Sequence, residues 1–345
     1  MPWGVGVIGA GPGASALHLA TLARLAESFV VVHVSDAGGG RAHELAARFG
    51  ASASTGTHDL LADPRVDVVV ICSPPAEHAA QILATVAAGK RAIFCEKPLA
   101  LSRDDAAQVI DACRAAGVAL VVGTNHLFDP AWGRAQHHIA AGGAPVRAIS
   151  ITVALPPNGR YHDVVSESLA AAAPARAAPD WSNPGVAAVL RQLILGLAVH
   201  DLPLVRDLAQ RIDRVVFARP VAPIGYLVGF VAGDIVVRLT AMMTPGGADA
   251  LWRIGIATSR DLVDIEFPPA FVHDGSAVVH VRTPDGRRTS YPVTEEDGYV
   301  AEWRALASIL DGHEVVEYDE ILADAEFAID LADAVEAAVL AEAAA

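Results

Sequence analysis

Cysteine, lysine and aromatic residues are scarce in this sequence of 345 residues. Its three cysteines show no Cys-x-x-Cys spacing, so they predict neither a zinc site nor a disulfide framework, and they suit a reducing compartment. No run of Lys or Arg forms a basic stripe, and the net charge is −15, which argues against nucleic acid as a partner. The histidines are scattered without His-Glu-x-x-His spacing, so no metal site is expected.

Long apolar runs and a basic leader are also lacking. Gly, His or Asp interrupts the longest apolar segments, so none is expected to span a bilayer. The N-terminus has no basic region and runs directly into a strand–turn pattern, unlike a signal peptide. We therefore expect a cytoplasmic protein that binds a small molecule. Hydrophobic residues make up 53% of the chain, enough for a large core, and the length suggests two domains.

The first third of the chain alternates short apolar runs with helical patterns. The apolar runs are continuous, as expected for parallel strands covered by helices on both faces. The expected strands are residues 5–8, 30–34, 66–72, 92–95 and 119–122, and the expected helices are 14–27, 41–49, 77–88 and 103–116, the last capped by Ser102. This pattern predicts an α/β domain with a doubly wound parallel sheet over residues 1–126.

The character of the sequence changes after residue 127. The expected strands there are residues 146–155, 214–219, 227–231, 235–242, 252–257 and 278–282. Their hairpin-like intervals predict a mainly antiparallel sheet in a second α/β domain over residues 127–345. We expect one helical stretch over 186–209, a final helix pair over 300–309 and 318–343, and a mobile low-complexity loop over 166–179.

A glycine-rich loop follows the first expected strand. It reads Gly9-Ala10-Gly11-Pro12-Gly13-Ala14 and opens a helix. Glycines let the backbone approach a pyrophosphate, whose charge is stabilised by free N–H groups at a helix N-terminus. The position after a strand and before an amphipathic helix predicts dinucleotide binding, and a purely structural turn is the alternative.

Asp36 ends the second expected strand, 25 residues after Gly11. A carboxylate there accepts hydrogen bonds from the adenosine ribose and repels a 2′-phosphate, which favours NAD(H) over NADP(H). The alternative is that Asp36 caps the turn before Gly38-Gly39-Gly40.

Polar residues follow the next strands. Ser73, Pro74 and His78 follow one, and Glu96-Lys97-Pro98 follows the other. The chain has only two lysines, Lys90 and Lys97, against 23 arginines, so a Lys after a sheet strand suggests a chemical role. An ammonium can donate to a substrate hydroxyl and help tune proton transfer.

These motifs resemble the Gfo/Idh/MocA oxidoreductases, the family of glucose–fructose oxidoreductase and inositol dehydrogenase. The resemblance rests on GVIGAGPGA, SPPAEHA, the 96–98 triplet, the segment 123–130, Val199-His200-Asp201 and the segment 298–303. It implies a Rossmann domain that binds NAD(P), followed by a domain with an open antiparallel sheet. One face of that sheet would carry substrate residues, and the other would form a homodimer or homotetramer interface.

The resemblance also implies roles for single residues. Lys97 would contact substrate beside the nicotinamide, Pro98 would shape that pocket through a cis bond, and His200 would accept the hydroxyl proton. The cofactor-binding residues expected in total are Gly9, Gly11, Pro12, Gly13, Ala14, Asp36, Ser73, Pro74, His78, Glu96, Lys97 and Asn125. The substrate-binding residues expected are Lys97, His126, Gln192 and His200.

The chain departs from the family pattern one helical turn before His200. Many members have an aspartate there, and this chain has Gly196. Candidate replacements for the missing polar group are Arg191, Gln192, Asp163 and Asp180. Pro203 is expected to kink the helix. Trp181 and Trp303 are expected to be packing anchors rather than platforms for substrate stacking.

Together these features favour an NAD(P)-dependent dehydrogenase or reductase. It would transfer hydride between the nicotinamide and a hydroxyl or carbonyl carbon of a sugar, cyclitol or related metabolite. The missing carboxylate leaves two alternatives. One is a non-redox lyase, epimerase or glycosidase that uses tightly bound NAD transiently, and the other is a nucleotide-binding protein without catalysis.

Overall fold

The computed structural model describes residues 1–157, 185–244 and 249–343. The predicted loop over 166–179, together with Asp163, Asp180 and Trp181, lies outside these residues. The chain divides into two compact units, each described by itself below. The first unit contains Met1–Thr124 and Tyr299–Glu326, and the second contains Asn125–Gly298 and Phe327–Ala345.

The first unit is built on a six-stranded sheet in the order β3-β2-β1-β4-β5-β6, in which every neighbouring pair is parallel. Its strands are β1 (Trp3–Ile8), β2 (Phe29–Asp36), β3 (Ser52–Thr55), β4 (Val68–Ile71), β5 (Ala92–Glu96) and β6 (Ala119–Gly123). The predicted doubly wound sheet is thus confirmed, with the strand order of a Rossmann domain. The order reverses between β1 and β4, which opens a crevice beyond the carboxyl ends of these two strands.

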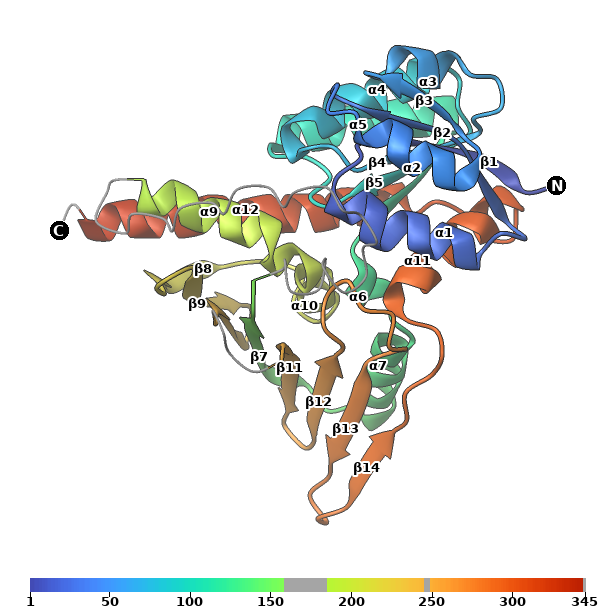
Figure 1. The fold of residues 1–345 in the computed structure, drawn as a ribbon. Helices are drawn as coiled ribbons and strands as arrows, with labels where there is room; N and C mark the ends of the chain where they lie inside the picture. Colours follow the sequence, from blue (N-terminus) through green and yellow to red (C-terminus); the bar gives the residue numbers. More distant parts are fainter. Residues whose placement is uncertain (158–184, 245–248, 344–345) are drawn as a thin grey trace. The chain divides into compact units, whose positions relative to one another are not determined.

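Short helices connect these strands (Figure 1). They are η1 (Ala14–His18), α1 (Leu19–Arg24), α2 (Arg41–Phe49), α3 (His58–Ala62), η2 (Pro75–Glu77), α4 (His78–Ala87) and α5 (Arg103–Ala116). The helix predicted over 14–27 begins with a five-residue π-helix, η1, and α1 ends at Arg24. Ser102 caps α5 as predicted, because its hydroxyl accepts a hydrogen bond from the Asp105 backbone N–H at 3.2 Å.

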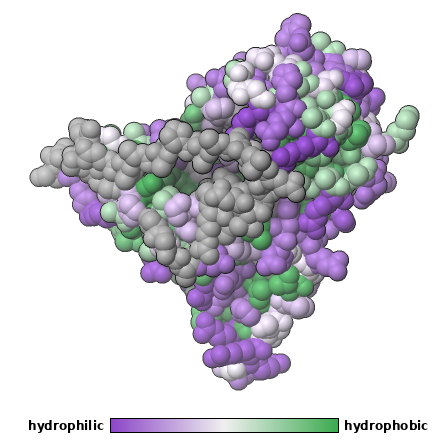
Figure 2. Space-filling model, in the orientation of Figure 1, coloured by the Kyte–Doolittle hydropathy of each residue, from purple (hydrophilic) through white to green (hydrophobic). Residues whose placement is uncertain are grey.

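The second unit is built on an eight-stranded sheet in the order β14-β13-β12-β11-β7-β10-β9-β8. Its strands are β7 (Val146–Leu155), β8 (Arg214–Pro220), β9 (Gly225–Ala232), β10 (Ile235–Met243), β11 (Leu251–Thr258), β12 (Leu262–Phe267), β13 (Val278–Arg282) and β14 (Arg288–Tyr291). The mainly antiparallel sheet is confirmed, with β7 and β10 as a parallel pair. Prediction missed β12 and β14. Figure 2 shows the tip of the β13–β14 hairpin, at the bottom of the view, as hydrophilic.

The residues of each strand alternate between the two faces of this sheet. On β7, Ile149, Ile151 and Val153 are buried, whereas the residues between them are partly exposed. Helix α7 (Pro130–Gly142), which prediction missed, contacts β12 and β13, and α9 (Val186–Gly196) contacts β9. One face of the sheet therefore holds the core of the unit.

The helical stretch predicted over 186–209 is interrupted. Helix α9 ends at Gly196, the 3-10 turn η3 covers Ala198–His200, and α10 covers Leu202–Leu208 with Pro203 in its first turn. The expected kink is thus present, as a bend of 71° between Val186–His200 and Leu202–Leu208. Within the part of the chain that the structure describes, no single helix has the length and apolarity to cross a membrane, although this bent pair has them together.

The remaining helices are α6 (Asn125–Phe128), α11 (Gly298–Leu310) and α12 (Tyr318–Ala343). The last two fall close to the predicted final pair. Most of α11 and the start of α12 belong to the first unit, and the rest of α12 belongs to the second.

Candidate active site

A cleft of about 840 Å³ lies at the carboxyl ends of β1, β2 and β4 in the first unit. It brings together five of the predicted cofactor-binding residues, namely Gly9, Gly11, Asp36, Ser73 and Pro74. Prediction missed the rest of its lining, which includes Ser35, Ala37, Gly39, Arg41, Gly56, Thr57, Cys72, Glu77 and Gln81. We call this space the glycine cleft.

Gly9 allows a close approach of two strands at the base of the glycine cleft. Its φ is +99°, and a Cβ there would lie 2.7 Å from the carbonyl carbon of Cys72, so no larger residue fits. Gly11 and Gly13 differ from Gly9, because a Cβ at either position would meet no atom within 4 Å. The backbone of this loop therefore borders open space at the start of η1, where N–H groups can face an anion. Pro12, Gly13 and Ala14 do not line the cleft themselves.

Asp36 caps the turn after β2, as the alternative interpretation required. Its carboxylate accepts hydrogen bonds from the backbone N–H groups of Gly38 at 2.8 Å and Ala42 at 2.9 Å. Desolvation raises the pKa of Asp36, but these and neighbouring N–H donors outweigh it and hold the pKa below its ordinary value. Because Asp36 also lines the glycine cleft, its ionised oxygens retain lone pairs for a ribose hydroxyl. Capping and cofactor contact are therefore compatible.

His78 is fully buried and does not line the glycine cleft. Its Nδ1 lies 2.9 Å from the carbonyl oxygen of Pro98, and its Nε2 lies 2.9 Å from that of Ser73. The ring thus connects the segment after β4 to the segment after β5. In this structure His78 supports the two loops that were predicted to hold a cofactor.

Glu96, at the end of β5, is held by a chain of hydrogen bonds that prediction missed. Its Oε1 lies 2.8 Å from Nε2 of His18, and Trp303 Nε1 donates to Nδ1 of His18 at 3.3 Å. Since the indole can only donate, Nδ1 accepts and Nε2–H donates to Glu96. Burial raises the pKa of Glu96, but the bond from His18 and the nearby Lys97 charge lower it below its ordinary value. Trp303, fully buried and stacked on Phe94 at 4.7 Å, packs in the core as expected.

Lys97 follows Glu96 at the edge of the sheet. Its backbone N–H donates to Glu96 Oε2 at 3.2 Å, and its peptide bond to Pro98 is cis, as expected. Burial lowers the pKa of the Lys97 ammonium, and the Glu96 carboxylate opposes part of that shift. The site therefore holds an ammonium that gives up its proton more readily than a surface lysine.

His200 lies in the second unit, on the turn η3 between α9 and α10. Its Nδ1 is 2.8 Å from Oδ1 of Asn125, the first residue of α6. Asn125 was predicted to bind the cofactor, and in this structure its side chain contacts the predicted catalytic histidine.

His126, predicted to bind substrate, is buried beside His200. Its Nδ1 lies 2.8 Å from Asp201 Oδ1, and its ring stacks on Phe267 at 3.8 Å. Asp201 is almost fully buried and also accepts hydrogen bonds from Trp252 Nε1 at 3.0 Å. Prediction missed this role of Asp201, because the carboxylate and its partners are far apart in the sequence.

Of the four candidate replacements for the missing aspartate, Arg191 and Gln192 lie in the described part of the chain. Arg191 pairs with Asp333 at 2.7 Å, and Gln192 is exposed on α9. A Cβ at Gly196 would meet nothing within 4 Å, so a side chain would fit there.

Known protein sequences match parts of this chain. Residues 3–124 match the family model described as an oxidoreductase family with an NAD-binding Rossmann fold. An inositol 2-dehydrogenase from Acidothermus cellulolyticus is 35% identical over 173 residues, 48% of this chain and 50% of that one. The uncharacterized oxidoreductase YrbE of Bacillus subtilis is 49% identical over 72 residues, 21% of each chain. The chain thus spans half or less of the length of these relatives.

The complete fold also has solved counterparts. A 3-ketoreductase from Actinomadura kijaniata, crystallised with NADP, has a TM-score of 0.73 at 20% identity, with 98% of each chain covered. At this identity the likeness shows the fold alone, and it extends over both units.

The chain of hydrogen bonds through Trp303 yields a stability prediction. Trp303→Phe keeps an aromatic ring against Phe94 but removes the indole N–H, which leaves the buried Nδ1 of His18 without that donor. We expect the free energy of unfolding of the full chain to fall by about 1–3 kcal/mol, measured by urea denaturation. Trp3→Phe, at a partly exposed indole, serves as the control. Equal stability of the two variants would contradict the hydrogen-bond assignment.

Proposed function

We propose that the protein is an NAD(P)-dependent dehydrogenase or reductase of the Gfo/Idh/MocA type, a proposal supported by the match of residues 3–124 to that family's NAD-binding Rossmann model. It transfers hydride between the nicotinamide and a hydroxyl or carbonyl carbon of a sugar, cyclitol or related small metabolite. Residues 1–126, joined in the first unit by Tyr299–Glu326, would form the dinucleotide-binding part, and the rest of residues 127–345 would form the part that binds substrate and assembles. The protein works in the cytoplasm.

The observation that supports this proposal most strongly is the glycine cleft, together with Lys97 directly after the end of β5. Gly11 and Gly13 leave open space beside the backbone at the start of η1, as a bound pyrophosphate requires. Asp36 lines the same cleft, 25 positions beyond Gly11, within reach of a ribose in this arrangement. The residues present therefore fit a dinucleotide.

The cofactor and the protein side chains have separate roles in the proposed reaction. When bound, NAD(H) supplies the hydride acceptor or donor. Lys97 orients the substrate oxygen by hydrogen bonding, and its lowered pKa favours exchange of a proton with that oxygen. His200 accepts the hydroxyl proton in the oxidative direction and returns it in the reductive direction.

The preferred cofactor is NAD(H) over NADP(H). Support comes from Asp36, whose lowered pKa keeps it negatively charged at neutral pH, where it repels a 2′-phosphate. Arg41 also lines the cleft and is the group that would favour NADP(H). The carboxylate of Asp36 accepts hydrogen bonds from N–H groups within the turn, which hold its charge in place.

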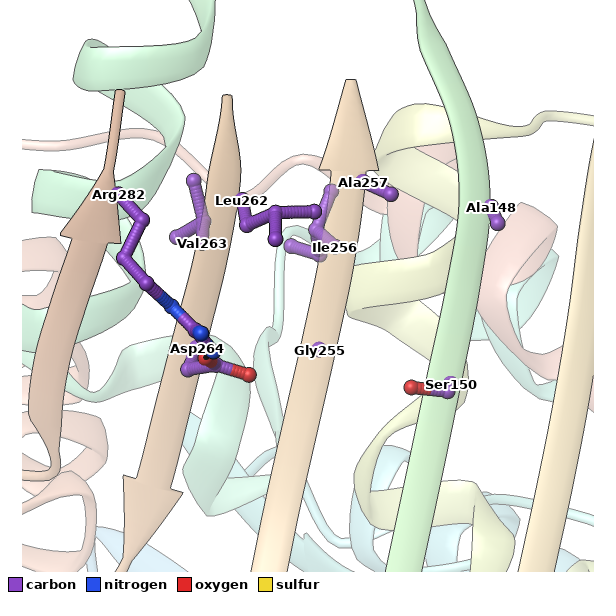
Figure 3. A pocket seen from close by; sticks show the side chains of 9 residues that line it. All are labelled: Ala148, Ser150, Gly255, Ile256, Ala257, Leu262, Val263, Asp264 and Arg282. Atoms are coloured by element: carbon purple, nitrogen blue, oxygen red, sulfur yellow. Dashed lines mark hydrogen bonds and ion pairs between the residues drawn. The ribbon is translucent and has the colours of Figure 1, made fainter. Parts of the chain in front are cut away.

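A homodimer or homotetramer forms through the open face of the eight-stranded sheet. Paired residues place Val231, Val236, Ala148, Ala257 and Leu262 in one row across this face. Val236 and Leu262 are 57% and 45% exposed, so the row presents apolar side chains at the surface of the unit. A shallow pocket of about 160 Å³ adjoins the row, with Arg282 directed toward Asp264 at its edge (Figure 3).

A non-redox lyase, epimerase or glycosidase with transiently used NAD is the second candidate. Gly196 favours it, because it stands four residues before His200, at the sequence position where many dehydrogenases of the family have an aspartate. Turnover of substrate without accumulation of NADH would identify this class.

Replacement of Lys97 tests the proposed function. With NAD⁺ and a panel of cyclitols and sugars, we expect the wild-type chain to produce NADH, measured by absorbance. In Lys97→Met, kcat should fall by about 10²–10⁴-fold, the usual contribution of a positioned acid–base group, while NADH still binds. Arg91→Met, which removes an exposed cation at the start of β5, should retain turnover. Full turnover by Lys97→Met would rule out the proposed role.

Replacement of Asp36 tests the cofactor preference. Asp36→Ala should bring the dissociation constants of NADH and NADPH closer together, measured by fluorescence titration, because the charge that repels the 2′-phosphate is gone. The loss of the cap should also lower stability by about 1 kcal/mol. Ser102→Ala loses a comparable cap on α5 and should leave the preference unchanged. An unchanged preference in Asp36→Ala would contradict the assignment.

Replacement of Leu262 tests the assembly. Leu262→Arg places a charge within the apolar row, so we expect the oligomer to dissociate in analytical ultracentrifugation. Val293→Arg, at an apolar residue that is 47% exposed outside the row, is the control. A wild-type monomer, or an oligomer that survives Leu262→Arg alone, would contradict the interface.

A further inference from the structure

The side chain of Asn125 determines which nitrogen of His200 can act as a base. The two side chains meet through Oδ1 of Asn125 and Nδ1 of His200, 2.8 Å apart. An amide oxygen only accepts, so Nδ1 must carry the proton in this bond. A neutral imidazole has one N–H, and its lone pair is therefore on Nε2. The contact selects one tautomer of His200 before any substrate arrives.

Asn125 is itself held by its surroundings. Its side chain is 7% exposed, and the backbone of Gly298 lies so close that a Cβ there would be 2.0 Å from the Asn125 carbonyl oxygen. Both residues belong to the second unit. The amide is thus a buried group on a tightly packed backbone, and it can orient a ring because it has little freedom to move.

Aromatic rings and a carboxylate from several elements lie near His200. The rings of His126, on α6, and Trp252, on β11, lie 5.6 Å and 5.4 Å from the His200 ring. Asp201 follows His200 in the chain, and its carboxylate accepts hydrogen bonds from His126 and Trp252. Tyr226, on β9, faces Asp201, and burial followed by that charge raises its pKa above its ordinary range. Within the described residues, the carboxylate of Asp201 is thus bonded to the other histidine, and an amide is bonded to His200.

We propose that Asn125 is a positioning residue that holds His200 in the tautomer with a basic Nε2, and that it does so without adding negative charge. The proposal rests on the proposed function, in which His200 accepts the substrate proton. In oxidation the hydroxyl O–H bond breaks as its proton passes to Nε2, while the C–H bond breaks as hydride passes to NAD⁺. The Nδ1–H bond to Asn125 persists through the step. A neutral amide stabilises the resulting imidazolium less than a carboxylate does, so His200 releases the proton more easily.

A positioning role for Asn125 differs from the expected role in cofactor binding, and the two roles predict different effects of substitution. A cofactor-binding Asn125 affects the dissociation constant of NADH. A positioning Asn125 affects kcat and its dependence on pH. Measurement of both quantities in one set of variants therefore distinguishes the two roles of Asn125.

The experiment compares Asn125→Asp and Asn125→Leu with the wild-type chain. Aspartate keeps the shape and adds a charge that favours imidazolium, so the pKa of His200 rises. Because oxidation needs neutral His200, activity is lost as pH falls through that pKa. The acid limb of kcat/KM should therefore move to higher pH by about one unit. Leucine removes the acceptor, and kcat should fall roughly 10- to 100-fold, within the range of acid–base contributions, with little change in KM.

The controls separate positioning from general charge and from folding. Gln108→Glu makes the same amide-to-acid change at an exposed position on α5 and should leave the pH profile unmoved. Titration with NADH should give similar dissociation constants for all four proteins. An unmoved acid limb in Asn125→Asp would overturn the proposal, as would weaker NADH binding with an unchanged pH profile.

A spectroscopic measurement is independent of turnover. Nitrogen-15 NMR of the full chain, with His200 assigned from a His200→Gln spectrum, should show a protonated Nδ1 and an unprotonated Nε2 at neutral pH. In Asn125→Leu, this single tautomer should give way to a mixture. If no substrate is turned over, the proposed function fails while the NMR result still decides the tautomer. A proton on Nε2 in the wild-type chain would overturn the inference.

Discussion

The close approach of Gly9 to the backbone of Cys72 is the constraint on which the first unit depends. It joins the carboxyl ends of β1 and β4 at the point where the strand order reverses, and it needs a positive φ and no Cβ. The turn that follows then leaves Gly11 and Gly13 beside open space. The glycine cleft, whose lining includes Asp36 and Ser73, is a consequence of that turn.

Buried and partly buried histidines hold the chemical groups in both units. His18 orients Glu96 beside Lys97, and His78 joins the carbonyls of Ser73 and Pro98. In the second unit, His126 is bonded to Asp201, and His200 is bonded to Asn125. Such groups are costly to bury unless their hydrogen bonds are made, so each bond restricts the ring to one orientation. Preorganisation of this kind is what a proton-transfer site needs.

Local signals explain what the sequence alone could predict. Continuous apolar runs located five of the six parallel strands, and the Gly9–Ala14 loop and the Lys97 triplet pointed to the correct edge of that sheet. Strand β3 was missed because Ser52–Thr55 is short and has no large apolar residue. The bonds from His18 to Glu96 and from Asn125 to His200 join residues 78 and 75 positions apart. No periodicity records such pairs, and only the folded chain brings them together.

The most direct test of the account is a fluorescence titration of the full chain, freed of bound nucleotide, with NADH and NADPH. The account predicts micromolar binding that favours NADH. It also predicts that Gly11→Glu folds normally, since its side chain meets open space, but fails to bind because it fills the position of the pyrophosphate and repels it. A wild-type chain that binds neither nucleotide, or a folded Gly11→Glu variant that binds NADH as well as wild type, would contradict the central claim.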